Sequence, residues 1–320
     1  MKELNPIISF VSPVYKAEKM LEKLVHEIQK VMLEINQPYE IILVDDRSPD
    51  NSWEVMKQLT SKYSEVKSIR LSRNFGQHPA IMAGLSLVKG EWIVVMDCDL
   101  QDQPKEVLKL YNKSKEGYDI VLAKRKSRQD GFLKKTTSFV FSKIYGFFTD
   151  TTYDNEVANF GIYHAKVIKS ISEISDSIKF FPLFVKFVGF KSTSIIVEHA
   201  KREEGNSSYN YAKLISLAFN SIISFSNKPL KLFVKFGLTI SGISFVLGLY
   251  NVYLAITNQI EVLGYSSIIV SIWFLSGIII TTIGVTGIYV GKIFDQTKNR
   301  PVFIIDEITI NKEFAVSKHQ

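Results

Sequence analysis

Two long segments near the carboxyl end contain no charged residue, and they limit the possible folds more than any other feature of the chain. The first extends from Phe236 to Ile260 and the second from Val262 to Gly291. Each is longer than the ~20 apolar residues that a helix needs to cross a bilayer. Buried helices of soluble proteins rarely stay uncharged for so long, so the two segments predict two membrane-spanning helices.

Basic residues flank this pair of segments, whereas the loop between them carries only Glu261. The flanking residues are Lys228, Lys231, Lys235, Lys292, Lys298 and Arg300. Because positive charge marks the cytoplasmic side, both ends of the hairpin and the domain before it are predicted to be cytoplasmic. The single cysteine, Cys98, fits a reducing compartment. We therefore expect a multi-pass protein of the cell (inner) membrane with three parts: residues 1–228, 229–291 and 292–320.

The first 125 residues alternate apolar runs with amphipathic stretches. The apolar runs predict strands at 7–11, 40–44, 66–71, 93–96 and 120–123, and the amphipathic stretches predict helices at 17–35, 52–63, 78–88 and 104–115. This alternation is typical of an α/β domain, in which helices cover both faces of a mostly parallel sheet. Ligands of such sheets bind beyond the carboxyl ends of the strands.

Polar residues follow three of the predicted strands, in "SPVY" (12–15), "VDDRSPD" (44–50) and "MDCDLQD" (96–102). Asp is common where a chain leaves a sheet, so each segment alone could be a turn. Their recurrence at one edge of the predicted sheet favours a ligand-binding site instead. Asp97 and Asp99 offer hard carboxylate ligands and Gln101 a neutral one, which suits Mg²⁺ or Mn²⁺. Such a cation would neutralise the charge of a leaving diphosphate.

The formal net charge of +7 is compatible with several anionic partners. Nucleic acid is one, but the predicted membrane spans favour anionic lipid or a phosphorylated substrate. Two stretches, 123–148 and 211–232, combine basic with apolar and aromatic residues. Their basic residues could simply be solvated, although in a membrane protein they better predict helices lying on the lipid headgroups.

The chain resembles the family 2 glycosyltransferases, and among them the polyisoprenyl-phosphate glycosyltransferases. The resemblance extends in order over about 300 residues. The segments that carry it are "ISFVSPVYKAE", "EIILVDDRSPDNS", "IRLSRNFGQHPAIMAGL", "VVMDCDLQDQP", "AKRKSR", "KREEGNSSY", "ISFSNKPLKL" and "GIYVGKIFDQTKNRP". It implies a GT-A fold, Rossmann-like with a mostly parallel sheet, followed by two transmembrane helices. It also implies a nucleotide-sugar donor.

The resemblance further implies roles for particular residues. Those expected to contact the donor nucleotide are Pro13, Tyr15, Asp45, Asp46 and Asp97. Those matching the family's DxDxQ metal motif are Asp97, Asp99 and Gln101, with Asp99 also counted as catalytic. Those expected at the acceptor phosphate or donor diphosphate are Arg125 and Arg128, a basic pair, and Arg202 and Ser207 of an "RxxGxS" motif.

The chain departs from the family pattern at two places. Relatives often carry an acid and an Arg in "GDFRL", where this chain reads "ANFGIY" with Asn159 and Gly161, and they often carry Lys at the position of Ser208. A catalytic base would then have to be Asp154 or Glu156. A lipid monophosphate has a second pKa near ~6, so it is largely the nucleophilic anion at neutral pH and needs orientation more than deprotonation.

The leading hypothesis is an inverting hexosyltransferase that makes a polyprenyl-phosphate sugar, of the undecaprenyl phosphate type, for cell-envelope glycan modification. The first alternative is a processive polysaccharide synthase, but the QxxRW motif of those enzymes does not occur here. The second is a non-catalytic membrane adaptor with a decayed transferase domain, against which Asp97, Asp99 and Gln101 argue. Nucleic acid is not expected as a partner, and association into a homo-oligomer is left open.

Overall fold

The structure is a computed structural model that describes residues 5–125, 146–148, 157–174, 176, 180–198, 226–257, 264–298 and 300–311. The chain divides into two compact units, one built around a β-sheet and the other around two long helices. Residues 300–311 belong to the sheet unit, although they follow the long helices in the sequence. The candidate site residues that the structure describes all lie in the sheet unit.

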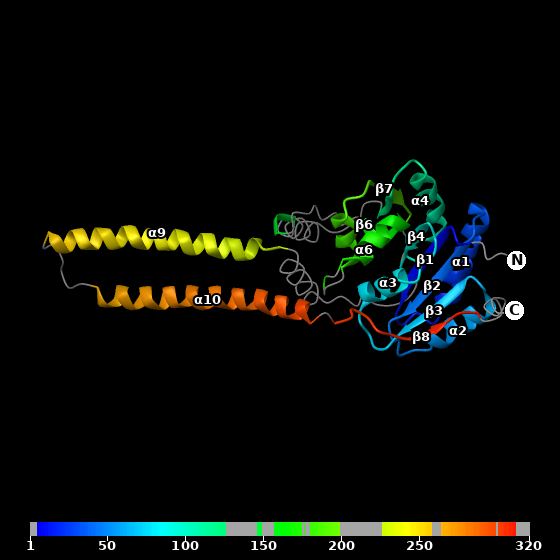
Figure 1. The fold of residues 1–320 in the computed structure, drawn as a ribbon, viewed down its shortest axis with the longest axis horizontal. Coiled ribbons are helices and arrows are strands. Elements are labelled where there is room, and N and C mark those ends of the chain that lie inside the picture. Colours follow the sequence, from blue (N-terminus) through cyan, green and yellow to red (C-terminus); the bar gives the residue numbers. More distant parts are fainter. Residues whose placement is uncertain are drawn as a thin grey trace. The chain divides into compact units, whose positions relative to one another are not determined.

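The sheet contains eight strands among the described residues, in the order β7-β5-β6-β4-β1-β2-β3-β8 (Figure 1). Their bounds are β1 Ile8–Val14, β2 Tyr39–Asp45, β3 Val66–Leu71, β4 Trp92–Val95, β5 Ile120–Arg125, β6 Val157–His164, β7 Ser192–Val197 and β8 Ile305–Thr309. Strand β6 runs antiparallel between β4 and β5, and β8 runs antiparallel beside β3. The remaining neighbours are parallel. The predicted mostly parallel sheet is thus confirmed.

Helices α1 (Leu21–Ile35), α2 (Ser52–Lys62) and α4 (Val107–Ser114) supply side chains to one continuous core cluster with the strands. The apolar residues of α1 recur every three or four positions, which places them on one face of the helix. They pack with strand residues such as Phe10, Leu43 and Val94, all fully buried. A short 3₁₀ helix, η1 (Pro104–Glu106), leads into α4.

Helix α3 (Gln77–Leu85) lies against the sheet at β1 and β2, and further contacts come from α6 (Ala165–Ser172) and α7 (Phe181–Phe187). Gly84 allows α3 to approach the strands closely. A Cβ atom at this position would overlap the side chain of Val11 and would lie 3.0 Å from that of Val44. The close approach matters because α3 begins beside the carboxyl edge of the sheet.

The five predicted strands and the four predicted helices are present, with shifted ends. The first helix begins at Leu21 rather than 17, because residues 18–20 form a turn in which the Met20 N–H donates to the Ala17 carbonyl over 2.9 Å. The predicted helix at 104–115 is divided into η1 and α4. Strands β6, β7 and β8 were not predicted from the sequence.

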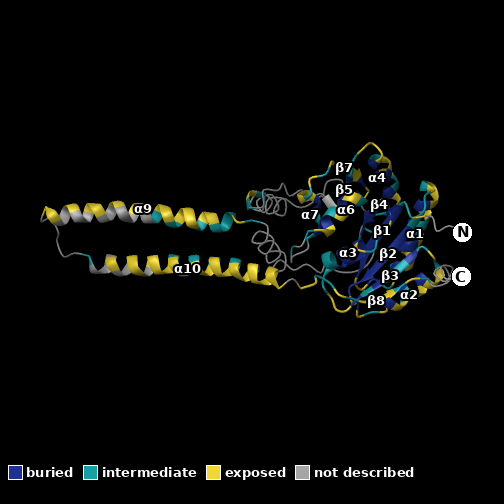
Figure 2. Ribbon diagram, in the orientation of Figure 1, coloured by how far each residue is buried: buried dark blue, intermediate teal, exposed yellow. Residues whose placement is uncertain are grey.

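The second unit contains α9 (Lys228–Ile256) and α10 (Tyr265–Thr297). Within α10, residues Phe274–Thr297 form a stretch long and apolar enough to cross a membrane, and none of its most apolar part is buried. Apolar residues such as Ile280 and Ile283 are exposed, and most of the described length of α10 is exposed (Figure 2). Among the described residues this is one candidate span, where the sequence predicted two. The span predicted within α9 stays a prediction.

Candidate active site at the carboxyl edge of the sheet

The carboxyl ends of β4, β1 and β2 lie side by side in the sheet. Val11 of β1 is in register with Val95 of β4, and Val14 of β1 is in register with Asp45 of β2. The segments that follow these strands hold the acids selected from the sequence. Strand order reverses direction at β1, since β2 and β3 extend to one side of it and β4 lies on the other. Ligands of open α/β sheets bind at such a switch point.

Pro13 ends the pairing of β1 with β4. At the end of that ladder the N–H of Met96 donates to the Val11 carbonyl over 3.1 Å. Residues 11 and 13 share one edge of the strand, and Pro13 has no N–H to extend the ladder toward β4. Beyond this point β4 continues into Asp97. Tyr15, the first residue after β1, is 47% exposed and so lies open at the edge.

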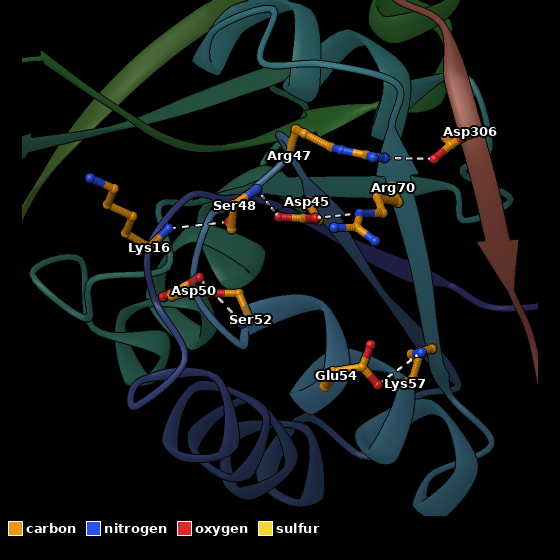
Figure 3. Close-up of polar contacts among 10 residues, drawn as sticks. All are labelled: Lys16, Asp45, Arg47, Ser48, Asp50, Ser52, Glu54, Lys57, Arg70 and Asp306. Carbon is orange, nitrogen blue, oxygen red and sulfur yellow. Dashed lines mark hydrogen bonds and ion pairs between the residues drawn. The ribbon is translucent and has the colours of Figure 1, made fainter.

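Asp45 ends β2 with its side chain fully buried. Its Oδ1 accepts the N–H of Ser48 over 2.9 Å, and its Oδ2 lies 3.3 Å from Nε of Arg70 (Figure 3). The second pair is an ion pair whose atoms are not aligned as a hydrogen bond. The Ser48 hydroxyl in turn accepts the N–H of Lys16 over 3.2 Å. Asp45 therefore shapes the loop after β2 and links it to the end of β1.

Asp46 joins the loop after β2 to the loop before α3. Its two carboxylate oxygens accept the backbone N–H groups of Phe75 and Gly76, over 2.7 and 2.8 Å. Burial raises the pKa of the Asp46 carboxyl, while these two hydrogen bonds act in the opposite direction. Gly76 has a φ of 99°, which glycine adopts without strain. In this structure both predicted nucleotide contacts, Asp45 and Asp46, thus bind protein groups, and their contact with a donor stays a prediction.

The segment after β4 alternates between partly exposed and buried residues. Asp97, Asp99 and Gln101 are partly exposed, whereas Cys98 and Leu100 are buried. Burial and the two neighbouring carboxylates raise the pKa of the Cys98 thiol to about 12, so it stays a neutral core residue. The alternation turns both Asp side chains away from the core, as the metal prediction requires.

The carboxylate of Asp97 is oriented by Gln77, the first residue of α3. The Gln77 side-chain amide donates to Oδ1 of Asp97 over 2.6 Å. Asp99 accepts the N–H of Gln101 over a longer 3.2 Å. No group of three or more His, Cys, Asp or Glu residues is arranged to hold a metal in the part of the chain described. Two partly exposed carboxylates nevertheless fit Mg²⁺ or Mn²⁺, which use one or two carboxylates and otherwise retain water or substrate oxygens.

His78, the neighbour of Gln77, was not selected from the sequence. Its Nδ1 atom is buried without a hydrogen-bond partner, and its ring packs edge-on against Phe180 with 4.6 Å between the centroids. Burial lowers the pKa of His78 to about 4. The imidazole is therefore neutral at physiological pH.

The residues predicted to bind phosphate are described only in part. Arg125 is the last residue of β5, in register with Val197 at the end of β7. Arg128, Arg202 and Ser207 lie outside the described residues, as do the predicted alternatives for a catalytic base, Asp154 and Glu156.

Gly161, one of the departures from the family pattern, lies in β6 between β4 and β5. A Cβ atom at this position would be 2.9 Å from the hydroxyl of Tyr163 and 3.0 Å from the carbonyl oxygen of Val121. Tyr163 is almost fully buried and stacks edge-on with Phe181. The space that an Arg side chain would need at position 161 is therefore already occupied in this chain.

Known proteins resemble this chain over nearly its whole length. The model of the family described as Glycosyl transferase family 2 matches residues 9–172. An uncharacterized glycosyltransferase of Synechocystis, sll0501, is 33% identical over 94% of this chain and 95% of its own length. The undecaprenyl-phosphate 4-deoxy-4-formamido-L-arabinose transferase of Klebsiella pneumoniae is 30% identical over 96% and 95%.

Among solved structures, the glucosyl-3-phosphoglycerate synthase of Mycobacterium tuberculosis, in complex with Mn²⁺, uridine diphosphate and glucosyl-3-phosphoglycerate, aligns with a TM-score of 0.49 and 15% identity. The alignment covers 68% of this chain and 78% of that one.

Proposed function

This chain belongs to glycosyl transferase family 2 and is a glycosyltransferase, and we propose that it transfers one sugar from a nucleotide sugar to a polyprenyl phosphate of the undecaprenyl phosphate type. The reaction takes place with inversion on the cytoplasmic face of the cell (inner) membrane and gives a lipid-linked monosaccharide for cell-envelope glycan modification. The observation that carries the proposal is the near full-length match to a transferase whose name gives undecaprenyl phosphate as its acceptor. That match covers 96% of this chain, so it includes most of α9 and α10 as well as the sheet.

In the proposed reaction a phosphate oxygen of the lipid attacks the anomeric carbon of the donor sugar. The bond from that carbon to the donor diphosphate breaks, and the nucleoside diphosphate leaves with the electron pair. Attack opposite the leaving group inverts the configuration. The acceptor phosphate is already largely anionic at neutral pH, so it needs orientation more than it needs a base. The proposed reaction therefore does not require an acid at position 159, where relatives often carry one and this chain has Asn159.

The carboxyl edge of the sheet offers groups for each part of the donor. Tyr15, exposed beyond β1, and the loop after β2 that Asp45 and Asp46 shape are suited to the nucleoside. Asp97 and Asp99, with Gln101, would hold a Mg²⁺ or Mn²⁺ ion beside the diphosphate. When bound, this ion offsets the negative charge that develops on the leaving group. Gln77 holds the Asp97 carboxylate in place for that role.

The acceptor phosphate is assigned to Arg125, Arg128, Arg202 and Ser207. Arg residues form bidentate charge-assisted bonds with phosphate, and Arg125 ends a strand at the same edge as Asp97. We assign α9 and α10 to the membrane, with the loop between them on the non-cytoplasmic side.

The test uses the full chain in detergent with undecaprenyl phosphate and labelled UDP-glucose, UDP-N-acetylglucosamine, GDP-mannose or dTDP-glucose. Label should enter the lipid extract as a single sugar, with release of one nucleoside diphosphate per sugar. Asp99→Asn, assayed in parallel, controls for a contaminating transferase. A labelled polymer, or turnover of a donor that leaves all of the label outside the lipid extract, would contradict the proposal.

A further inference from the structure

We propose that strand β8 is part of the donor site, where its Asp306 positions the loop after β2 through Arg47 and so sets the affinity for the nucleotide. This inference rests on the proposed function, because it takes that loop to be the nucleotide contact. It assigns a positioning role to two residues that have no role in the sequence-based prediction. Both lie in the sheet unit.

Arg47 and Asp306 are far apart in sequence but form an ion pair, with 2.7 Å between a guanidinium nitrogen of Arg47 and Oδ2 of Asp306 (Figure 3). Arg47 directly follows Asp45 and Asp46, and Asp306 is the second residue of β8. The pair therefore connects the edge strand to the loop that the two acids shape.

The backbone at Arg47 has a φ of 57°, in the left-handed region that a residue with a Cβ atom adopts at a cost of about 1–2 kcal/mol. Glycine would adopt it without that cost. The hydrogen bonds of Asp45 and Asp46 fix the residues on either side of this point, and the Asp306 contact fixes the side chain. Strain held in place by surrounding contacts is a recurrent feature of ligand-binding loops.

Contacts continue from this loop toward the candidate metal ligands. Asp46 accepts the N–H groups of Phe75 and Gly76, and the next residue, Gln77, donates to Asp97. The loop after β2 and the carboxylate after β4 are thus joined by hydrogen bonds of 2.6 to 2.8 Å. A displacement of the loop after β2 should therefore also displace the Asp97 carboxylate.

Strand β8 is held in place by more than the ion pair. Its strand pairing with β3 is preceded by a bond from the Ser72 N–H to the Ile304 carbonyl, 2.9 Å long. After the strand, the Asn311 side-chain amide donates to the Ser61 carbonyl over 3.2 Å. Removing the Asp306 carboxylate should therefore leave the strand in place and change only what it contacts.

The experiment compares wild type with Asp306→Ala, Arg47→Ala, the double variant and the charge-reversed pair Arg47→Asp/Asp306→Arg. Binding of UDP, GDP and dTDP in the presence of Mn²⁺ is measured by calorimetry, and KM by the transfer assay. For Asp306→Ala we expect nucleotide affinity to fall about two- to fivefold, as fits a half-exposed ion pair. The KM for donor should rise equally, while the KM for undecaprenyl phosphate and the thermal midpoint stay unchanged.

The charge-reversed pair should recover most of the lost affinity, because Asp tolerates the left-handed backbone at position 47. The two alanine substitutions should not be additive, since each removes the same contact. The matched control is Lys166→Ala. It breaks a comparable 2.6 Å ion pair, with Asp119, at the opposite edge of the sheet and should leave all these quantities unchanged.

Wild-type affinity and donor KM in Asp306→Ala would overturn the inference, and so would a charge-reversed pair that recovers nothing. A wild-type chain that binds none of the three nucleotides would overturn it as well. If the wild type binds a nucleotide but makes no lipid-linked sugar, the proposed function fails alone. The binding measurements then still decide the role of Asp306.

Discussion

The side-chain amide of Gln77 donates a hydrogen bond to the carboxylate of Asp97, with 2.6 Å between Nε2 and Oδ1. This contact connects the start of α3 with the end of β4, and it orients one of the two acids assigned to the metal. Since Gln77 itself carries no charge, its contribution is geometric.

Replacing Gln77 with Ala should lower turnover about tenfold. A hydrogen bond to a charged group contributes about 1.5–3 kcal/mol, and water that replaces the Gln77 amide should restore only part of this energy. Binding of Mn²⁺, followed by electron paramagnetic resonance, should weaken in parallel. Gln29→Ala is the matched control, because Gln29 makes a similar 2.9 Å bond to Glu65 away from the site. Equal effects of the two substitutions would mean that Gln77 supports only the fold.

Asp97→Asn and Asp99→Asn should each remove most of the turnover while the thermal midpoint changes little, since both side chains are partly exposed. Excess chelator should have the same effect on wild type, and Mg²⁺ or Mn²⁺ should restore activity. Cys98→Ala serves as the control between them, because Cys98 is buried in the core. Full activity in excess chelator would show that the reaction needs no metal ion.

Stability should fall as pH decreases from about 6.5 to about 4, because of His78. Its pKa is lowered to about 4 in the folded chain, against 6.5 for an unperturbed His. Between these values the unfolded chain binds the proton and the folded chain does not, so acid favours unfolding. The effect is at most about 3 kcal/mol, and less because the ring is partly exposed. Urea unfolding at several pH values should show that the free energy of unfolding depends less on pH in His78→Phe than in wild type. An identical pH dependence would show that His78 is not its cause.

Gly161→Ala should lower the free energy of unfolding by about 1–3 kcal/mol, because the new Cβ would crowd the Tyr163 hydroxyl and the Val121 carbonyl. Adding Tyr163→Phe should recover part of the loss, since it removes the nearer of these atoms. The carbonyl contact would remain. Urea midpoints of the single and double variants measure this coupling, and an unchanged midpoint in Gly161→Ala would show that the strand relaxes freely.

Arg125→Ala and Arg202→Ala should impair transfer severely and leave nucleotide binding nearly unchanged, as expected of groups that hold the acceptor phosphate. Lys at either position should restore little, because it lacks the planar guanidinium. Lys134→Ala and Lys135→Ala are the comparison, with an expected loss only in membrane association, at about 1 kcal/mol each. Wild-type saturation with undecaprenyl phosphate in both Arg variants would refute the acceptor assignment.

The parallel part of the sheet could be predicted because each strand from β1 to β5 has its own local pattern of buried residues. Strands β6 and β7 were not predicted, and β7 in particular offers no run of buried residues, since it alternates exposed and partly exposed residues up to Val197. Strand β8 was not predicted either, because the sequence of residues 305–309, "IDEIT", is largely polar and exposed at the sheet edge. The positions of Asp45, Asp46, Asp97 and Asp99 at one edge followed from the alternation of strands and helices.

Their partners did not follow from the sequence. The bonds from Phe75 and Gly76 to Asp46 depend on how the loop before α3 returns to the sheet, and the Arg47 contact depends on an unpredicted strand. Gln77 stood in a family-like segment but had no signal of its own. The first predicted membrane span, within α9, stays a prediction.

The placement of β8 also has a consequence for biosynthesis. Strand β3 is made early, yet its neighbour in the sheet is encoded after both long helices. On the ribosome, the outer edge of β3 must therefore wait without its partner until α9 and α10 have been synthesised. A nascent chain that stalled before residue 305 would expose that edge, which is the kind of surface that recruits other strands. The sheet can therefore be completed only after the whole helical hairpin has been translated.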